Sequence, residues 1–404
     1  MERFAIEKLL IWKDSKYRKP LILRGARQVG KTWLMKEFGK YFNSFAYINF
    51  DEHKDYFQFF ENTKDVFRIV KNLEFATGKK IDKDTLLIFD EIQECPNALN
   101  TLKYFCENLP EYFVIAAGSL LGLILSSGFP VGKVDFLDIE PLSFSEFLNE
   151  TADSNLLAYI NQIDRIEPIP DNFFNLLLDH LKMYLITGGM PEPVYLWTKE
   201  HDMQLVDKTL LNILYSYQSD FSKHLNNFTN ENTKHDVQKI SLIWKSIPAH
   251  LAKEKKKFMY SNVKKGARAR EYETNLEWLV NANLVKKIQK VSKPFLPLSA
   301  YIESEYFKVY HFDVGLLRKQ SQLNFQVFIE GNRLFSEFKG ALTENFVMQS
   351  LTNLFSNNLY YWANDKYEVD FVVQIENNVI PIEVKTGKNV SSPSLNFYKK
   401  LYQT

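Results

Sequence analysis

Short apolar runs alternate with amphipathic segments over the first 150 residues of this 404-residue chain. Residues 33–38 and 56–76 repeat apolar positions at helical spacing, and Thr77 and Gly78 are expected to end the second helix. The runs with the length and composition of buried strands are residues 21–23, 45–50, 86–89, 112–117 and 134–139. This alternation is typical of a parallel sheet covered by helices, so we predict an α/β domain over residues 1–150.

The pattern becomes helical from residue 151 onward. Residues 176–185 and 205–214 have the apolar spacing of helices, and Gly188 to Pro193 form a break between them. We predict a helical lid over residues 151–234.

Residues 235–322 are predicted to form a winged helix-turn-helix, because three helices precede two paired strands. The helices are expected at 240–251, from 261 and at 268–282, and the strands at 284–288 and 307–310. Residues 253–290 hold eleven basic and four acidic side chains, and Arg268 and Arg270 lie on the expected recognition helix. Two interpretations stay open, namely DNA contact and a solvated face of a module that contacts proteins.

The last segment, residues 323–404, is predicted to be a second α/β domain. A helix is expected over 338–355, and residues 376–378 have the composition of a hairpin turn. Strands are expected at 360–362, 368–375 and 379–385, and a further helix at 394–402.

The segment after the first apolar run has the spacing of a phosphate-binding loop. Glycines let backbone N–H groups surround phosphates, and the next helix adds the positive end of its dipole. Lys31 is expected to reach the β- and γ-phosphates of ATP as a catalytic cation, and the Thr32 hydroxyl to hold Mg²⁺. The residues expected to contact ATP are Gly25, Ala26, Arg27, Gln28, Val29, Gly30, Lys31, Thr32 and Trp33.

Two carboxylates follow the apolar run at residues 86–89. Asp90 is expected to bind Mg²⁺ beside the phosphate loop, and Glu91 to polarise the attacking water as the catalytic base. Ser119 follows the run at 112–117 and either faces the γ-phosphate and the water or is a simple turn serine.

A second acidic constellation lies near the end of the chain. Asp370 is flanked by apolar residues, where a charge is costly unless it is paired or bound to a metal. An aspartate followed by Glu383 and Lys385 on the next strand is the arrangement of restriction-type nucleases, with Mg²⁺ between the carboxylates and Glu344 in support. A buried ion-pair network on an inactive scaffold remains the alternative.

Composition narrows the class of protein. Cys95 and Cys106 lack metal-site spacing and are expected to be reduced thiols of a cytosolic protein. The N-terminal residues lack the layout of a signal peptide, and no apolar run reaches membrane-spanning length. We therefore expect a cytoplasmic protein without membrane contact, and the formal charge of +1 does not itself demand a nucleic-acid partner.

These motifs together resemble bacterial and archaeal AAA-type ATPases fused to a C-terminal domain of unknown function. The resemblance covers essentially the whole chain and is carried by residues 24–32, 47–50, 89–93, 141–147, 188–192 and 368–371. It implies an AAA+-like ATPase domain, a helical lid, a winged helix and a restriction-nuclease-like PD-(D/E)XK fold. Lys133 stands where similar members tend to carry an arginine, and the nuclease-like domain is expected to be incomplete because such domains usually continue with another strand.

We therefore predict an ATP-hydrolysing, Mg²⁺-dependent protein that couples nucleotide state to a C-terminal module binding nucleic acid or protein. Two alternatives stay open. One is a nucleotide-dependent binding switch with negligible turnover and an inactive nuclease-like domain. The other is an ATP-regulated DNA nuclease. Protein partners and self-association also stay open.

Overall fold

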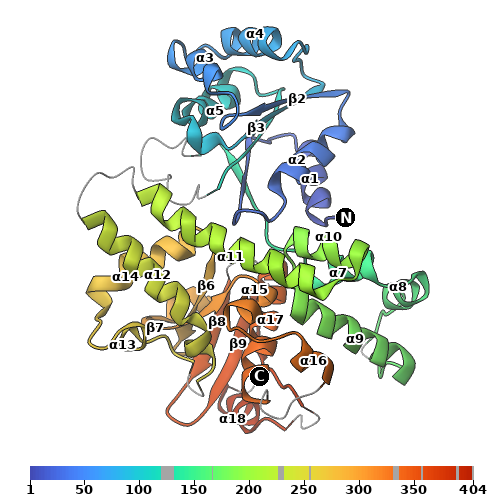
Figure 1. Ribbon diagram of the computed structural model, residues 1–404, viewed down its shortest axis with the longest axis vertical. Helices are drawn as coiled ribbons and strands as arrows, with labels where there is room; N and C mark the ends of the chain where they lie inside the picture. Colours follow the sequence, from blue (N-terminus) through green and yellow to red (C-terminus); the bar gives the residue numbers. More distant parts are fainter. Residues whose placement is uncertain are drawn as a thin grey trace. The chain divides into compact units, whose positions relative to one another are not determined.

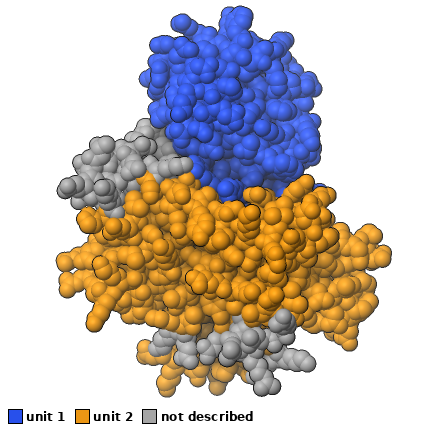
Figure 2. Space-filling view, viewed as in Figure 1, with its two compact units in different colours: residues 1–140, 281–283 blue, residues 141–280, 284–404 orange. Residues whose placement is uncertain are grey.

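The computed structural model describes residues 1–119, 132–165, 167–225, 232–253, 256–330, 336–355, 358–387 and 391–402. The chain forms two compact units, which Figure 2 colours separately. Unit 1 comprises Met1–Glu140 and Asn281–Asn283, and unit 2 comprises Pro141–Val280 and Leu284–Thr404.

Unit 1 is built on a five-stranded sheet in the order β2-β3-β4-β1-β5, in which all neighbouring strands are parallel (Figure 1). The strands are β1 (Leu21–Arg24), β2 (Ser44–Asn49), β3 (Thr85–Asp90), β4 (Phe113–Ala117) and β5 (Asp135–Asp138). The predicted parallel sheet is confirmed. Because β4 lies between β1 and β3, the segments that follow these three strands meet at one edge of the sheet.

The helix predicted over residues 56–76 is wrong as a continuous element, because the chain turns at residues 62–65. The Asp65 carboxylate accepts the Phe67 N–H at 3.0 Å, a local bond that starts a new helix. The predicted end is confirmed, since the last helix stops at Thr77 and Gly78 adopts φ 65°. The helical elements of unit 1 are α1 (Ala5–Asp14), α2 (Lys31–Phe38), η1 (Gly39–Tyr41), η2 (Lys54–Phe57), α3 (Gln58–Glu61), α4 (Val66–Thr77), η3 (Ile92–Glu94) and α5 (Pro96–Asn108).

The core of unit 1 lies between the sheet and helices α4 and α5. Ile48, Phe89 and Leu102 are fully buried there. The Phe60 ring packs edge-on against Phe50 and Phe89, with ring centroids 5.5 and 5.7 Å apart. This aromatic packing stabilises the position of β3, which carries the predicted Mg²⁺ ligand at its end.

The helices of unit 2 begin before residue 151, where the helical region was predicted to start. The first of them spans Phe144–Thr151. Its Ser143 N-cap and Glu146 form a capping box, in which the Ser143 N–H donates to Glu146 Oε2 at 2.7 Å. No helix in the described ranges is long and apolar enough to cross a membrane. The first helices of unit 2 are α7 (Phe144–Thr151), α8 (Ser154–Asn161), α9 (Asp171–Thr187), α10 (Pro191–Glu200), α11 (Met203–Leu225), α12 (Asn232–Leu251), α13 (Tyr260–Val263) and α14 (Ala269–Asn281).

A second five-stranded sheet lies in unit 2, in the order β10-β9-β8-β6-β7. Its strands are β6 (Val285–Val291), β7 (Ile302–His311), β8 (Leu359–Ala363), β9 (Glu368–Ile375) and β10 (Asn378–Ile382). β6 and β7 pair antiparallel as predicted, but β6 also pairs parallel with β8. The domain boundary expected near residue 322 therefore does not divide this sheet, because strands from both sides of it hydrogen-bond to each other.

Two helices cover opposite faces of this sheet. Lys308 contacts both the Tyr361 ring and Glu344 of α17, whereas the neighbouring Trp362 packs on Tyr398 of α18. Successive strand residues point to opposite faces, so α17 and α18 lie on different sides. The remaining helical elements are η4 (Leu298–Tyr301), α15 (Val314–Gln320), α16 (Gln326–Glu330), α17 (Ser336–Phe355) and α18 (Pro393–Tyr402).

The strand predicted over residues 379–385 is shorter in the structure. β10 ends at Ile382, so Glu383 and Lys385 lie beyond it rather than on its face. The Val384 N–H donates to Asp370 Oδ2 at 2.8 Å. A side-chain carboxylate therefore takes the place of a backbone carbonyl as the acceptor at this point.

Two glycines join α9 to α10 through close contacts inside unit 2. Gly188 adopts φ 71°, and a Cβ there would lie 2.2 Å from Asp313 Oδ1. The Gly189 N–H donates to Asp313 Oδ2 at 2.7 Å, and a Cβ on Gly189 would lie 2.1 Å from the Leu142 carbonyl oxygen. A larger residue at Gly188 would be strained by the positive φ and would displace the Asp313 side chain, and one at Gly189 would have to move backbone.

We expect Gly189→Ala to destabilise unit 2 by on the order of 1–3 kcal/mol, because its methyl group meets backbone atoms. The matched control is Gly340→Ala on α17, where an added Cβ meets nothing within 4 Å. That variant is expected to be neutral or to stabilise by about 0.5–1 kcal/mol. Urea unfolding followed by tryptophan fluorescence measures both, and equal midpoints for the two variants would contradict the packing described here.

Candidate functional site

The loop between β1 and α2 has the backbone of a phosphate-binding loop. Gly25, Gln28 and Gly30 adopt φ values of 148°, 64° and 91°. A Cβ on Gly25 would lie 2.2 Å from the Ile139 carbonyl oxygen, so this position requires glycine. The sequence motif therefore forms the compact turn that it predicted, directly before the first turn of α2.

An arginine outside the motif anchors this loop. Arg3 is 5% exposed and donates from one guanidinium nitrogen to the Val29 carbonyl at 2.9 Å. Another of its nitrogens donates to the Glu140 carbonyl at 2.7 Å. Sequence reasoning missed Arg3, because nothing local signals a contact 26 residues away.

The Lys31 side chain is buried against its own loop. Its Nζ donates to the Gly25 carbonyl at 2.9 Å and to the Ala26 carbonyl at 2.7 Å. Burial lowers the pKa of Lys31 to about 8, although Glu91 and Asp90 partly oppose this shift. The ammonium is therefore held by two carbonyls of the loop.

Asp90 ends β3 with a carboxylate that is almost fully buried. Its Oδ2 accepts from the Thr32 hydroxyl at 2.6 Å and from the Tyr47 hydroxyl at 2.9 Å. Its Oδ1 accepts from the Glu91 N–H at 3.0 Å. The structure thus brings together the two predicted Mg²⁺ ligands, Thr32 and Asp90. Sequence reasoning did not identify Tyr47 as a hydrogen-bond donor to Asp90. Burial and the Asp90 charge raise the pKa of the Tyr47 hydroxyl.

Glu91 and Ser119 are linked through a glutamine. Gln93 Nε2 donates to Glu91 Oε2 at 2.5 Å and lies 3.4 Å from Ser119 Oγ. Arg27 Nε donates to the same Ser119 hydroxyl at 3.1 Å. Side chains that follow β1, β3 and β4 therefore converge at the edge of the sheet, and Ser119 is bonded to two of them.

The two other residues of unit 1 that the sequence singled out, Trp33 and Lys133, lie at the surface. Trp33 on α2 is 42% exposed. Lys133 Nζ lies 3.1 Å from Glu107 Oε1. Residues 130 and 131, which belong to the segment before Lys133 used for the resemblance, lie outside the described residues.

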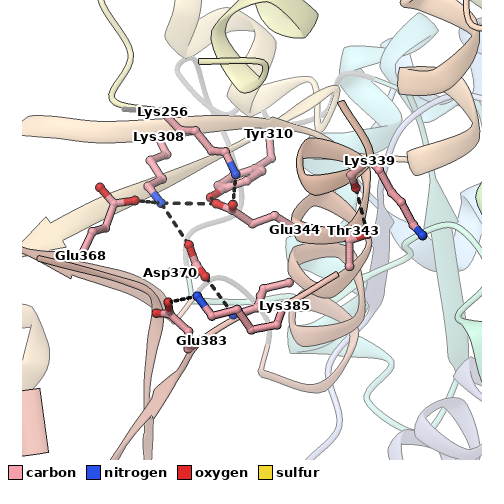
Figure 3. A network of polar contacts seen from close by, with 11 residues as sticks. Lys256, Lys308, Tyr310, Lys339, Thr343, Glu344, Glu368, Asp370, Glu383 and Lys385 are labelled. Atoms are coloured by element: carbon pink, nitrogen blue, oxygen red, sulfur yellow. Dashed lines mark hydrogen bonds and ion pairs between the residues drawn. The ribbon is translucent and has the colours of Figure 1, made fainter. Parts of the chain in front are cut away.

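The second acidic constellation surrounds a buried lysine (Figure 3). Lys308 Nζ lies 2.5 Å from Glu368 Oε1, 3.3 Å from Glu344 Oε1 and 3.9 Å from Asp370 Oδ1. Glu344 also accepts from the Tyr310 hydroxyl at 2.5 Å and pairs with Lys256. Glu344 and Asp370 thus come together as expected, but around a cation that sequence reasoning did not identify.

Charge balance explains the protonation of this network. Burial and the nearby Glu344 raise the pKa of Asp370 to about 7. Burial also disfavours the charged form of Glu344, but Lys308 and Lys256 outweigh it and hold the Glu344 pKa at about 2. Below its pKa, Asp370 is mostly protonated, and the two lysines then balance Glu344 and Glu368. Burial favours the neutral form of Lys308, and the surrounding carboxylates raise its pKa nevertheless.

Glu383 and Lys385 form a separate pair beside this network. Lys385 Nζ donates to Glu383 Oε1 at 2.7 Å, and Asp370 is hydrogen-bonded to the same segment through the Val384 N–H. Within the described ranges, no group of three or more His, Cys, Asp or Glu side chains is arranged to hold a metal ion. The cation that faces Asp370 is therefore Lys308, not Lys385.

Arg268 directly precedes α14 and Arg270 lies in its first turn, and both are exposed. Lys264 and Lys265, which precede them, are exposed as well. None of these four side chains makes an ion pair with any residue that the structure describes. Among the described residues, this segment therefore presents positive charge to solvent without a paired carboxylate.

Comparison with known families divides the chain into three matched parts. Residues 17–148 match a family described as an AAA domain. Residues 178–326 and 339–404 match two families described as domains of unknown function, DUF8612 and DUF4143. The comparison with curated proteins gave no match.

Solved structures are similar only at a low level. The C. elegans PCH-2 structure is 15% identical with a TM-score of 0.29, over 49% of this chain and 61% of that one. AMPPCP-bound DnaA from Aquifex aeolicus is 13% identical with a TM-score of 0.24, over 68% and 85%. The Aeropyrum pernix ORC1 protein in complex with DNA is 11% identical with a TM-score of 0.28, over 80% and 92%. Similarity at this level carries no argument, so the comparison that counts is the family match: residues 17–148, which contain the loop between β1 and α2, match an AAA domain.

The raised pKa of Asp370 predicts a pH-dependent stability. The folded chain holds this proton more tightly than the unfolded chain, so the free energy of unfolding should fall as pH rises from about 4 to about 7. Asp370→Asn should remove on the order of 2 kcal/mol of this decline. The control Asp365→Asn, an exposed aspartate on the adjoining turn, should keep it. Urea unfolding between pH 4 and 8 measures the profiles, and an unchanged slope in Asp370→Asn would refute the assignment.

Proposed function

We propose that this chain binds ATP with Mg²⁺, hydrolyses it, and couples the nucleotide state to unit 2. The observation that supports this most directly is the 2.6 Å hydrogen bond between the Thr32 hydroxyl and the Asp90 carboxylate. These are the two side chains that would hold Mg²⁺, and they already adjoin at the end of the phosphate loop. Carboxylate and hydroxyl oxygens are the hard donors that suit this ion, which would neutralise phosphate charge when bound.

Lys31 would stabilise negative charge on the β- and γ-phosphates. Its ammonium donates to two carbonyls of the loop whose N–H groups would surround the phosphates. An anionic phosphate oxygen is a stronger acceptor than a neutral carbonyl, so Lys31 would exchange one for the other. With a pKa of about 8, it remains mostly protonated at neutral pH.

Glu91 would act as the base that polarises the attacking water. Gln93 orients its carboxylate through the 2.5 Å hydrogen bond, and we propose Gln93 as a positioning residue. Ser119 lies at the same edge of the sheet and would face the γ-phosphate or the water, while Arg27 holds its hydroxyl.

For unit 2 we propose a binding module whose nuclease-like constellation is an ion-pair network. This proposal is supported by Lys308, which is fully buried among three carboxylates. A fixed ammonium there provides the charge compensation that a divalent ion would provide in a nuclease. An ATP-regulated nuclease would require Lys308 to leave this position.

A nucleic acid is the partner that the exposed cations favour. Lys264, Lys265, Arg268 and Arg270 lie within seven residues and are free of ion pairs in the part of the chain that the structure describes. Free lysines and arginines bind phosphates and release counterions. The module would then report the nucleotide state of the P-loop domain to DNA or RNA.

Removal of the Lys31 charge should abolish tight ATP binding. We expect Lys31→Ala to weaken ATP affinity by at least about 10-fold, because a charge-assisted contact to phosphate contributes more than about 1.5 kcal/mol. Lys40→Ala, an exposed lysine after α2, is the matched control and should bind ATP normally. Isothermal titration calorimetry measures both, and equal affinities would refute the phosphate role of Lys31.

Glu91→Gln should separate binding from turnover. The amide keeps the shape of the carboxylate but cannot accept a proton, so ATP should still bind while hydrolysis falls by about 10²-fold or more. Glu94→Gln, three residues away on η3, should hydrolyse ATP at the parental rate. Steady-state phosphate release measures the rates. Parental turnover in Glu91→Gln would mean that another group is the base, and negligible turnover in the parent would favour the binding switch.

Binding of DNA by unit 2 should weaken as salt rises. Replacing Arg268 and Arg270 by glutamate should lower affinity on all sequences alike and make the salt dependence shallower. Fluorescence anisotropy at several salt concentrations measures this, and an unaltered slope would leave a protein-contact module. Plasmid DNA incubated with Mg²⁺ should stay intact, whereas cleavage would favour the ATP-regulated nuclease.

A further inference from the structure

A pocket of about 640 Å³ opens in unit 2 beside the Lys308 network. Its wall includes Tyr361 and Glu368, and both contact Lys308. β6, β7 and the turn between β8 and β9 contribute the other sides. The volume is that of a site for a small organic ligand.

An irregularity in the sheet turns Tyr306 toward this pocket. Gln289 pairs with Phe307, but the next residue, Lys290, pairs with Glu303. Residues 304–306 therefore have no partner in the β6–β7 ladder, and the Tyr306 side chain is left 38% exposed. Lys257 approaches β7 through an isolated bridge to Lys308.

Two ammonium groups converge on the Tyr306 ring. Lys257 Nζ lies 3.7 Å and Lys290 Nζ 4.9 Å from the ring centroid. The ring offsets part of the repulsion between these two cations, because its face is electron-rich. A third ammonium, that of exposed Lys366, also lines the pocket.

Two of the three carboxylates that line the pocket are paired, whereas the third, the exposed Asp365, has no cation partner in the described ranges. Two of the three lysines that line the pocket are likewise unpaired there. Glu303 pairs with Lys290 at 2.8 Å, and Glu368 pairs with Lys308 at 2.5 Å. No carboxylate in the described ranges pairs with Lys257 or Lys366. Among the described residues, the unpaired Lys257, Lys366 and Asp365 leave the pocket with one net positive charge, which favours an anionic ligand over a cation.

We propose that this pocket binds one nucleotide unit, with its phosphate on Lys257, Lys290 and Lys366. The source is a single-stranded nucleic acid or a free mononucleotide, and the first rests on the nucleic-acid role proposed for unit 2. The segment that supplies Lys257 continues into the exposed cations Lys264, Lys265, Arg268 and Arg270, which would follow the neighbouring phosphates of a strand. Tyr306 acts as a positioning residue that holds two ammonium groups together.

The test uses the full chain and three probes: fluorescein-labelled twelve-residue oligothymidylate, thymidine 5′-monophosphate and inorganic phosphate. Lys257→Gln should weaken oligonucleotide binding severalfold and lower the slope of log affinity against log salt by about 0.7. Tyr306→Leu should weaken binding similarly, while Tyr306→Phe should restore it because the ring is kept. Lys199→Gln on α10 is the matched control and should bind as the parent does. Circular dichroism checks that each variant is folded.

The outcomes separate this proposal from the function proposed above. If the Lys257 and Tyr306 variants bind normally and only the Arg268 and Arg270 replacements weaken binding, the pocket is refuted and the nucleic-acid role stands. Mononucleotide titrations use the Lys31→Ala background, so that the phosphate loop does not contribute. Lys257-dependent binding of the mononucleotide without oligonucleotide binding supports the pocket and refutes the nucleic-acid role. Binding of neither probe, or of inorganic phosphate alone, overturns the proposal.

Discussion

The buried carboxylate of Asp90 imposes the geometry of unit 1 around the phosphate loop. Asp90 is 2% exposed, and a charge in that position must be compensated by hydrogen bonds. Thr32, Tyr47 and the Glu91 N–H provide three of them, from α2, β2 and the segment after β3. Satisfying one carboxylate therefore holds the start of α2 against two strands and keeps the loop in register with the sheet.

Compensation of a buried charge also organises unit 2, but there the buried group is a cation and its partners are carboxylates. Lys308 is fully buried on β7, and its ammonium is compensated by carboxylates from α17 and β9. The network joins a strand from the expected winged helix to elements of the expected nuclease-like domain. This explains why the two parts share one sheet, since separating them would leave Lys308 and Glu344 buried without partners.

Several expectations depended only on neighbouring residues, and these agree with the structure. The phosphate loop, the strand that ends at Asp90 and the stop at Gly78 each rest on a short contiguous pattern. The helix over 56–76 was wrong because Asp65 offers a local cap that apolar periodicity does not reveal. The strand over 379–385 was too long because the Asp370 side chain, fourteen residues from Val384, takes the next N–H.

Lys308 shows most clearly how far the site could be predicted from the sequence. It stands between apolar residues of a strand, the same signal that singled out Asp370, and it could have been recognised as a buried charge in need of a partner. Its partners could not, because they lie 36, 60 and 62 residues away on other elements. The sequence by itself determined the parallel α/β domain and the chemistry of its phosphate loop, since backbone conformation and strand burial follow from local patterns. Only the tertiary structure decided which cation faces Asp370 and which carbonyls hold Lys31, because long-range packing selects one pairing among many of similar local energy.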